Sequence, residues 1–257
     1  MTNFQQMFKV NFLHQFKLVN QLIFFDFLGI IISFVMTLIL SSYVRSRWTV
    51  VLAGLVALVG FITIISCVAM LAVTTKNQMH ANRFRLVPIT EARLYTTIIL
   101  NSITVLFYLI IVQLVLGIIV CGLAWLYSDF RFSGISTFNF WIDLLQGLVA
   151  GIFNFLLSAL AFILIVHLID FVSTVILDYV PGGRQRIVKL VVYLVAIFAV
   201  VYLVGGLLRL FKIASFQLAG VSVDRVYLWL NVFFLLILTT LMGVANVFLT
   251  KFLETDR

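Results

Sequence analysis

The chain has 257 residues, of which 64% are hydrophobic and 10% are charged. Soluble domains average roughly 45–50% apolar and about 25% charged residues, so this composition excludes a water-soluble globule and a large aqueous catalytic domain. A net charge of +8 would suit a nucleic-acid-binding protein, but the basic residues lie in short segments between apolar runs. Lipid headgroups and membrane insertion explain that distribution better, and we expect no nucleic-acid partner.

Six apolar stretches are each long enough for a helix that crosses about 30 Å of hydrocarbon, which takes roughly 20 residues. They cover residues 22–44, 49–73, 98–127, 141–169, 187–208 and 227–250. A membrane β-barrel would instead show weak runs of about ten alternating residues. We therefore predict an all-α, polytopic membrane protein whose residues 1–257 form a single transmembrane domain with six transmembrane helices.

The basic residues predict the orientation of these helices, because cytoplasmic loops carry an excess of Lys and Arg. With the N-terminus inside, eleven of the seventeen Lys and Arg residues lie on the inner side and six on the outer side. We therefore expect both termini in the cytoplasm, in a multi-pass protein of a bacterial cell membrane.

Residues 1–21 combine a phenylalanine repeat with polar residues roughly opposite it. The repeat is Phe4, Phe8, Phe12 and Phe16, and the polar residues are Gln6, Lys9, Lys17 and Asn20. This pattern predicts an amphipathic helix lying in the cytoplasmic interface of the membrane. The alternative is an extension of the first membrane helix, which would leave these polar residues poorly placed in hydrocarbon.

Residues 74–97 are the most charged stretch of the chain. Pro88 disfavours a helical conformation at Val87, and Thr90 can then cap a new helix with Glu91 in its first turn. We predict a basic, partly helical cytoplasmic elbow that breaks at Pro88 and restarts as the base of the next span. The alternative is a solvated loop whose arginines only satisfy the orientation rule.

Residues 209–226 are too apolar for a free aqueous loop and too interrupted for a span. We predict a short interfacial helix or a re-entrant segment in the outer leaflet, which is tolerated only where protein buries it or it lines a cavity.

The chain lacks the nucleotide-binding, zinc-binding and serine-hydrolase motifs that carry common catalytic chemistry. We expect no catalytic residue, no metal ligand and no cofactor in this chain. The ionisable residues of the spans fall within a turn or two of predicted ends, where water reaches them; they are Asp26, Asp143, His167 and Lys189. We thus expect no buried ion pair and no proton relay, which disfavours an intramembrane enzyme and a secondary transporter.

Two neutral polar residues lie deeper in the spans, Gln113 in the third and Asn154 in the fourth. Such residues are more often hydrogen-bonded between helices than bound to substrate, so both are candidates for helix packing or passage lining. Gly147 and Gly151 form a GxxxG pattern, which permits close approach of a helix within the chain or from a second copy.

The segment RFRLVPITEARLY at residues 83–95 carries a resemblance to a known family. With six spans, an N-terminal interfacial helix and a semi-apolar outer segment before the last span, the chain resembles the permease subunit of a type-two ABC exporter. The resemblance covers nearly the whole chain in layout and about a dozen residues in motif. It implies that a coupling element docks on a separate ATP-binding subunit and contains Arg83, Phe84, Arg85, Leu86, Val87, Pro88, Ile89, Thr90 and Glu91.

The resemblance also implies the partners of the chain. ATP and Mg would be bound by the separate ABC subunit, and a second permease copy or a related permease would complete the passage. With 26 Phe and few charges in the spans, the expected cargo is amphipathic or hydrophobic, such as an antibiotic, a membrane-active peptide or a lipid-like molecule. The alternative is a non-transporting membrane immunity or scaffold protein that binds a partner within the bilayer.

Overall fold

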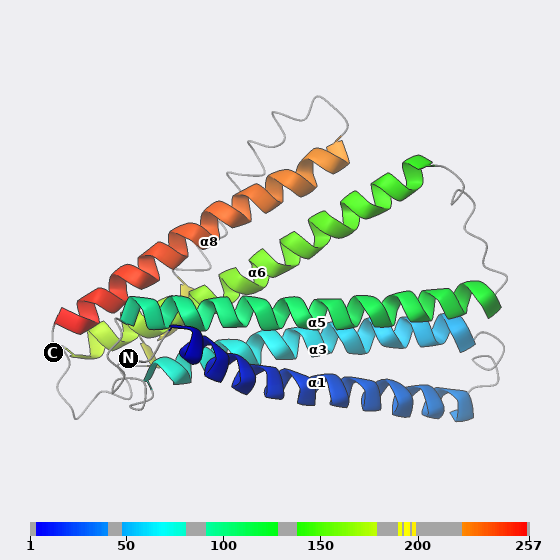
Figure 1. Cartoon of the computed structure of the whole chain (residues 1–257), viewed down its shortest axis with the longest axis horizontal. Helices are drawn as coiled ribbons and strands as arrows, with labels where there is room; N and C mark the ends of the chain where they lie inside the picture. The colour runs from blue at the N-terminus through cyan, green and yellow to red at the C-terminus, as the bar shows by residue number, and fades with distance from the viewer. Residues whose placement is uncertain are drawn as a thin grey trace. The chain divides into compact units, whose positions relative to one another are not determined.

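The computed structural model describes residues 4–40, 48–80, 91–127, 138–178, 190–191, 193–195, 197–198 and 223–255, and every one of them is helical. Five long helices account for most of these residues (Figure 1): α1 (Phe4–Leu40), α3 (Trp48–His80), α5 (Glu91–Tyr127), α6 (Phe138–Asp178) and α8 (Val223–Thr255). The all-α prediction is confirmed for these ranges.

All five long helices are long and apolar enough to cross a membrane, which agrees with a multi-pass membrane protein. The stretches that satisfy both criteria are Phe8–Leu40, Trp48–Met79, Ala92–Ala124, Leu145–Ile176 and Trp229–Thr250. The other expected span, residues 187–208, lies largely outside the described residues. A count of six spans and the cytoplasmic placement of the termini therefore stay predictions.

The first helix is longer than the sequence pattern predicts. Residues 1–21 were expected to form a separate interfacial helix, but α1 runs without a break from Phe4 to Leu40. Neither glycine nor proline interrupts residues 4–28, so backbone hydrogen bonding continues through the expected boundary. At about 1.5 Å per residue, its 37 residues extend for roughly 55 Å, well beyond the hydrocarbon thickness of about 30 Å.

One face of α1 is buried and unusually polar, whereas the exposed positions from Phe24 to Leu40 are all apolar. The buried stripe has helical spacing and includes Asn11, Gln15, Val19, Ile23, Asp26 and Ile30. The exposed positions include Phe24 and Phe25, with 62% and 64% of their surface accessible. Polar groups that pack on protein while apolar side chains face outward are typical of helices in lipid. Within the N-terminal segment, Asn11 and Gln15 are buried against protein, whereas Lys9, Lys17 and Asn20 are exposed.

The helices form two compact units. One unit contains residues 2–71 and 97–145, and there α1, α3 and α5 lie side by side (Figure 1). An apolar layer of Ile30, Val56 and Val120 joins these three helices. The other unit contains residues 72–96 and 146–257, so it combines the end of α3 and the beginning of α5 with α6 and α8.

Both ends of the expected elbow at residues 74–97 are helical. α3 continues to His80, and α5 begins at Glu91, where the sequence predicts that a helix restarts. Residues 81–90, which include Pro88 and Thr90, lie outside the described residues. α6 likewise extends to Asp178, past the predicted end of its span at residue 169, because the sequence after Asp170 stays apolar.

Candidate functional site

A buried ionic cluster joins α3 to α6 in the second unit. The Lys76 ammonium lies 2.7 Å from Asp170 Oδ1 and donates a hydrogen bond of 2.8 Å to Tyr193 Oη. The Tyr193 hydroxyl donates in turn to Asp170 Oδ1 at 2.5 Å. The Asp170 side chain is only 6% exposed, while that of Lys76 is 27% exposed. Lys76, Tyr193 and Asp170 therefore contact one another pairwise, and the Asp170 carboxylate is almost completely buried.

A histidine one turn earlier on α6 extends this cluster. His167 Nε2 lies 2.8 Å from Thr75 Oγ1, and the Thr75 hydroxyl also lies 3.1 Å from the Ala72 carbonyl, to which it can donate. Which group donates in the bond between His167 and Thr75 depends on the tautomer of the ring. His167 and Asp170 are three residues apart, so they share one face of α6.

An aromatic contact ties the beginning of α5 to the same face of α6. Tyr95 is 2% exposed, and its ring centroid lies 5.7 Å from that of His167 and 6.0 Å from that of Phe171. We call the set Thr75, Lys76, Tyr95, His167, Asp170 and Tyr193 the Asp170 cluster. It places both helical flanks of residues 81–90 on one helix, since Thr75 and Lys76 precede that segment and Tyr95 follows it.

A second polar cluster lies within the first unit. Asp26 on α1 is 2% exposed. Its Oδ1 accepts a hydrogen bond of 2.7 Å from Thr63 Oγ1 on α3, and its Oδ2 accepts one of 2.8 Å from Gln113 Nε2 on α5. Asp26, Thr63 and Gln113, the Asp26 cluster, therefore join all three helices of the unit.

A glycine makes room for this cluster. A Cβ atom added to Gly60 would lie 2.7 Å from Gln113 Oε1, which is closer than real Cβ contacts permit. Beside them, an open groove of about 360 Å³ runs between α3 and α5. Its lining is apolar and mostly small except for the Gln113 amide, and consists of Ala53, Val56, Ala57, Gly60, Phe61, Ile64, Gln113, Gly117, Val120 and Cys121.

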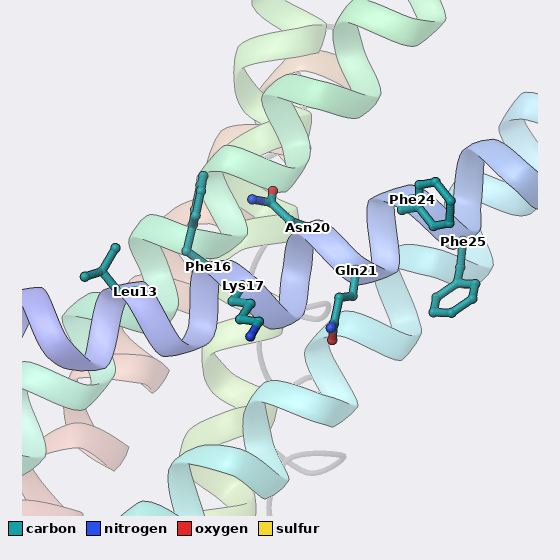
Figure 2. Close-up of a pocket in the computed structure, with 7 residues that line it drawn as sticks. All are labelled: Leu13, Phe16, Lys17, Asn20, Gln21, Phe24 and Phe25. Atoms are coloured by element: carbon teal, nitrogen blue, oxygen red, sulfur yellow. The ribbon is translucent and has the colours of Figure 1, made fainter.

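A larger hollow lies along the exposed side of α1 (Figure 2). It has a volume of about 850 Å³ and is lined by Leu13, Phe16, Lys17, Asn20, Gln21, Phe24 and Phe25. Its lining is therefore amphipathic: apolar and aromatic side chains occur at both ends of the lining segment, and three polar side chains lie between them. Asn20 Oδ1 also accepts a hydrogen bond of 3.0 Å from the Tyr108 hydroxyl of α5.

The structure describes only some of the site residues that the sequence predicts. Arg83, Phe84, Arg85, Leu86, Val87, Pro88, Ile89 and Thr90 lie outside the described residues, and Glu91 is the first residue of α5. Gln113 and Asn154 both make the interhelical hydrogen bonds expected of them. Gln113 bonds to Asp26, and Asn154 Oδ1 accepts a bond of 2.8 Å from Asn231 of α8. Gln113 belongs to the first unit and Asn154 to the second.

Gly147 and Gly151 do not bring another described helix close. A Cβ atom added to either glycine would meet nothing within 4 Å in the described structure. The GxxxG face of α6 is therefore open, and it makes no close helix contact within these ranges of the chain.

Sequence reasoning missed the Asp170 cluster and misplaced Asp26. The expectation of no buried ion pair is wrong, because Lys76 and Asp170 form one. Asp26 was assigned to a span end, but it bonds Thr63, the sixteenth residue of the 33-residue α3. The missed signal was the His167 and Asp170 pair at helical spacing, followed by apolar residues that continue the helix.

Comparisons of the chain with protein-family models, curated proteins and solved structures give no match.

Proposed function

We propose that this protein is the permease subunit of an ATP-driven exporter, coupled through residues 81–90 to a separate ATP-binding subunit. The observation that carries the proposal is the attachment of both flanks of this segment to α6. Lys76 and Thr75 bind Asp170 and His167 from the α3 side, and Tyr95 packs on His167 from the α5 side.

This attachment is what a mechanical coupling element needs. A partner that binds residues 81–90 and shifts them displaces the end of α3 and the beginning of α5 together. The end of α3 and the beginning of α5 are both held on α6 by buried polar and aromatic contacts. A displacement of these two helix ends would therefore move α6 as well. Packed elements with discrete arrangements convert small displacements into helix movements in this way.

The amphipathic hollow of α1 supports an amphipathic or hydrophobic cargo. Phe16, Phe24 and Phe25 offer apolar contact, while Lys17 and Gln21 offer charge and hydrogen bonds on the same helix (Figure 2). Binding sites for such molecules are mostly apolar, with a few polar groups that fix orientation. The cargo passage would be completed by a second permease copy or a related permease, and ATP and Mg would be held by the partner ATPase.

The proposal is tested by purifying the chain with any ATP-binding-cassette protein encoded next to it. We expect the two to copurify, and we expect the variant Leu86→Asp/Ile89→Asp to lose permease-dependent ATPase activity while still inserting in the membrane. The matched control is Ile213→Asp/Leu218→Asp, the same apolar-to-acid change in the segment predicted to lie on the outer side; it should keep the coupled activity. Complex formation and activity unchanged in Leu86→Asp/Ile89→Asp would contradict the assignment.

The same experiment addresses the non-transporting alternative. If no ATPase copurifies and the biological effect of the chain persists in cells that lack the neighbouring ATPase, the chain acts as a scaffold or immunity protein rather than a permease.

A further inference from the structure

The exposed side of α1 includes polar side chains as far as Gln21 and only apolar ones from Phe24 onward. The apolar part, from Phe24 to Leu40, extends for roughly 24 Å at about 1.5 Å per residue, which is close to the hydrocarbon thickness of about 30 Å. The step between Gln21 and Phe24 therefore corresponds to the depth at which the hydrocarbon of a bilayer meets its headgroups.

The hollow along α1 lies across this step. Its lining consists of two rows of residues spaced four apart, and residues at this spacing share one side of a helix. The rows are Leu13, Lys17, Gln21 and Phe25, and Phe16, Asn20 and Phe24. In each row the polar residues come directly before the phenylalanine that ends it. The hollow thus places polar groups at headgroup depth and aromatic surface at acyl-chain depth, which is the order in which a phospholipid presents its own parts.

The polar part of the hollow is positively charged. Lys17 is exposed, and its side chain points to the same side of α1 as the Gln21 side chain (Figure 2). Residues 4–25 contain two lysines and no acidic residue, and the Asp26 that follows them belongs to the buried face of the helix. An ammonium group next to an amide N–H suits the oxygens of a phosphate, and the positive charge favours a lipid headgroup with net negative charge.

The second row is held in position by α5. The Tyr108 hydroxyl donates a hydrogen bond of 3.0 Å to Asn20 Oδ1, and the Tyr108 ring centroid lies 4.8 Å from that of Phe16. Two lining side chains are therefore ordered before any ligand arrives, which lowers the entropy cost of binding. The hollow is in this respect a preformed site.

We propose that the hollow along α1 binds a phospholipid with an anionic headgroup, taken from the surrounding bilayer. The lipid phosphate accepts hydrogen bonds from Lys17 and Gln21, and the acyl chains lie along Phe24 and Phe25. The inference goes beyond the proposed function and does not require an ATPase. A cargo molecule that uses the same hollow has to displace this lipid.

Native mass spectrometry of the full-length protein in a nonionic detergent tests the proposal, because it counts the lipids that each chain retains. The probes are phosphatidylglycerol, which is anionic, and phosphatidylcholine, which has the same acyl chains and a zwitterionic headgroup. We expect the unaltered protein to bind one phosphatidylglycerol about fivefold more tightly than phosphatidylcholine, which is the effect of one lysine beside an anionic headgroup.

The headgroup contact is tested at Lys17. Lys17→Gln removes the charge and should lower the affinity for phosphatidylglycerol about fivefold without changing that for phosphatidylcholine, and Lys17→Arg should preserve the preference. Lys9→Gln is the matched control, because it makes the same change at an exposed lysine of α1 about 12 Å away. An equal loss in Lys9→Gln and Lys17→Gln would overturn the proposal, since the lipid would then respond to the overall charge of the helix.

The acyl-chain contact is tested separately. Phe24→Ala/Phe25→Ala should weaken the binding of both lipids, whereas the control Ile31→Ala/Ile32→Ala, at exposed positions farther along α1, should not. Glycerol phosphate, which lacks acyl chains, should fail to displace phosphatidylglycerol at equal concentration. Displacement by glycerol phosphate, or unchanged binding in Phe24→Ala/Phe25→Ala, would refute a lipid site. None of these results depends on copurification of an ATPase, so this proposal and the permease proposal fail separately.

Discussion

The Lys76 and Asp170 pair gives the sharpest stability prediction, because its two members differ in burial. Removing one partner of a fully buried ion pair costs about 3–5 kcal/mol, since the other charge is left buried. The Asp170 side chain is 6% exposed, so Lys76→Met leaves a buried carboxylate. The Tyr193 hydroxyl still donates to it, and we expect a loss of about 2 kcal/mol. Asp170→Asn leaves Lys76, which at 27% exposure reaches water, and should cost about 1 kcal/mol.

The assay is reversible unfolding in mixed micelles with an increasing fraction of denaturing detergent, followed by circular dichroism. A loss of about 2 kcal/mol corresponds to a roughly thirtyfold change in the unfolding equilibrium constant, which this measurement resolves. The double variant Lys76→Met/Asp170→Asn should be more stable than the sum of the single losses predicts, by about 1 kcal/mol. Equal single losses that add without coupling would refute the reasoning.

Two further predictions concern single contacts. Gly60→Ala should displace the Gln113 amide from Asp26, because the added Cβ lies 2.7 Å from Gln113 Oε1. Gly54→Ala is the control, because a Cβ atom added to Gly54 would lie within 4 Å of no other atom and both variants gain the same helix propensity. In the same unfolding assay, Gly60→Ala should therefore be less stable than Gly54→Ala by about 1–2 kcal/mol. Thr75→Val removes the Thr75 to His167 hydrogen bond at constant shape and should cost about 1 kcal/mol, while Thr75→Ser should cost less. Equal stability within either pair of variants would show that the contact contributes nothing.

The helices themselves could be predicted well from the sequence, because length and hydropathy decide whether a segment can cross a membrane. The beginning of α5 at Glu91 follows the expected restart after Pro88 and Thr90. The continuity of α1 was less predictable. The prediction of a separate helix rested on Lys9, Lys17 and Asn20, which are exposed in the structure. Asn11 and Gln15, which the sequence pattern did not single out, are buried.

The polar clusters could not be predicted in the same way. A helix that is apolar all round gives no periodic signal for the face that meets protein and the face that meets lipid. Asp26 and Gln113 are 87 positions apart, and Lys76 and Asp170 are 94 positions apart. Only the packing of separate helices shows that the members of each pair meet. Gln113 and Asn154 were recognised because a neutral polar residue deep in a span needs a hydrogen-bonding partner, even though the sequence does not identify that partner.

The grouping of residues 72–96 with residues 146–257 has a consequence for synthesis of the chain. Lys76 and Tyr95 leave the ribosome about 70–90 residues before His167 and Asp170, which at roughly 5–20 residues per second is a delay of several seconds. During that interval α1, α3 and most of α5 can already assemble through their own contacts, including those of Asp26. The helix ends that flank residues 81–90, the proposed ATPase contact, can form their contacts with His167 and Asp170 only after α6 has been synthesised. A nascent chain truncated before His167 should therefore retain the first unit but lack the contacts of Thr75, Lys76 and Tyr95 with α6, so we expect the partner subunit to be recruited only after α6 has been made.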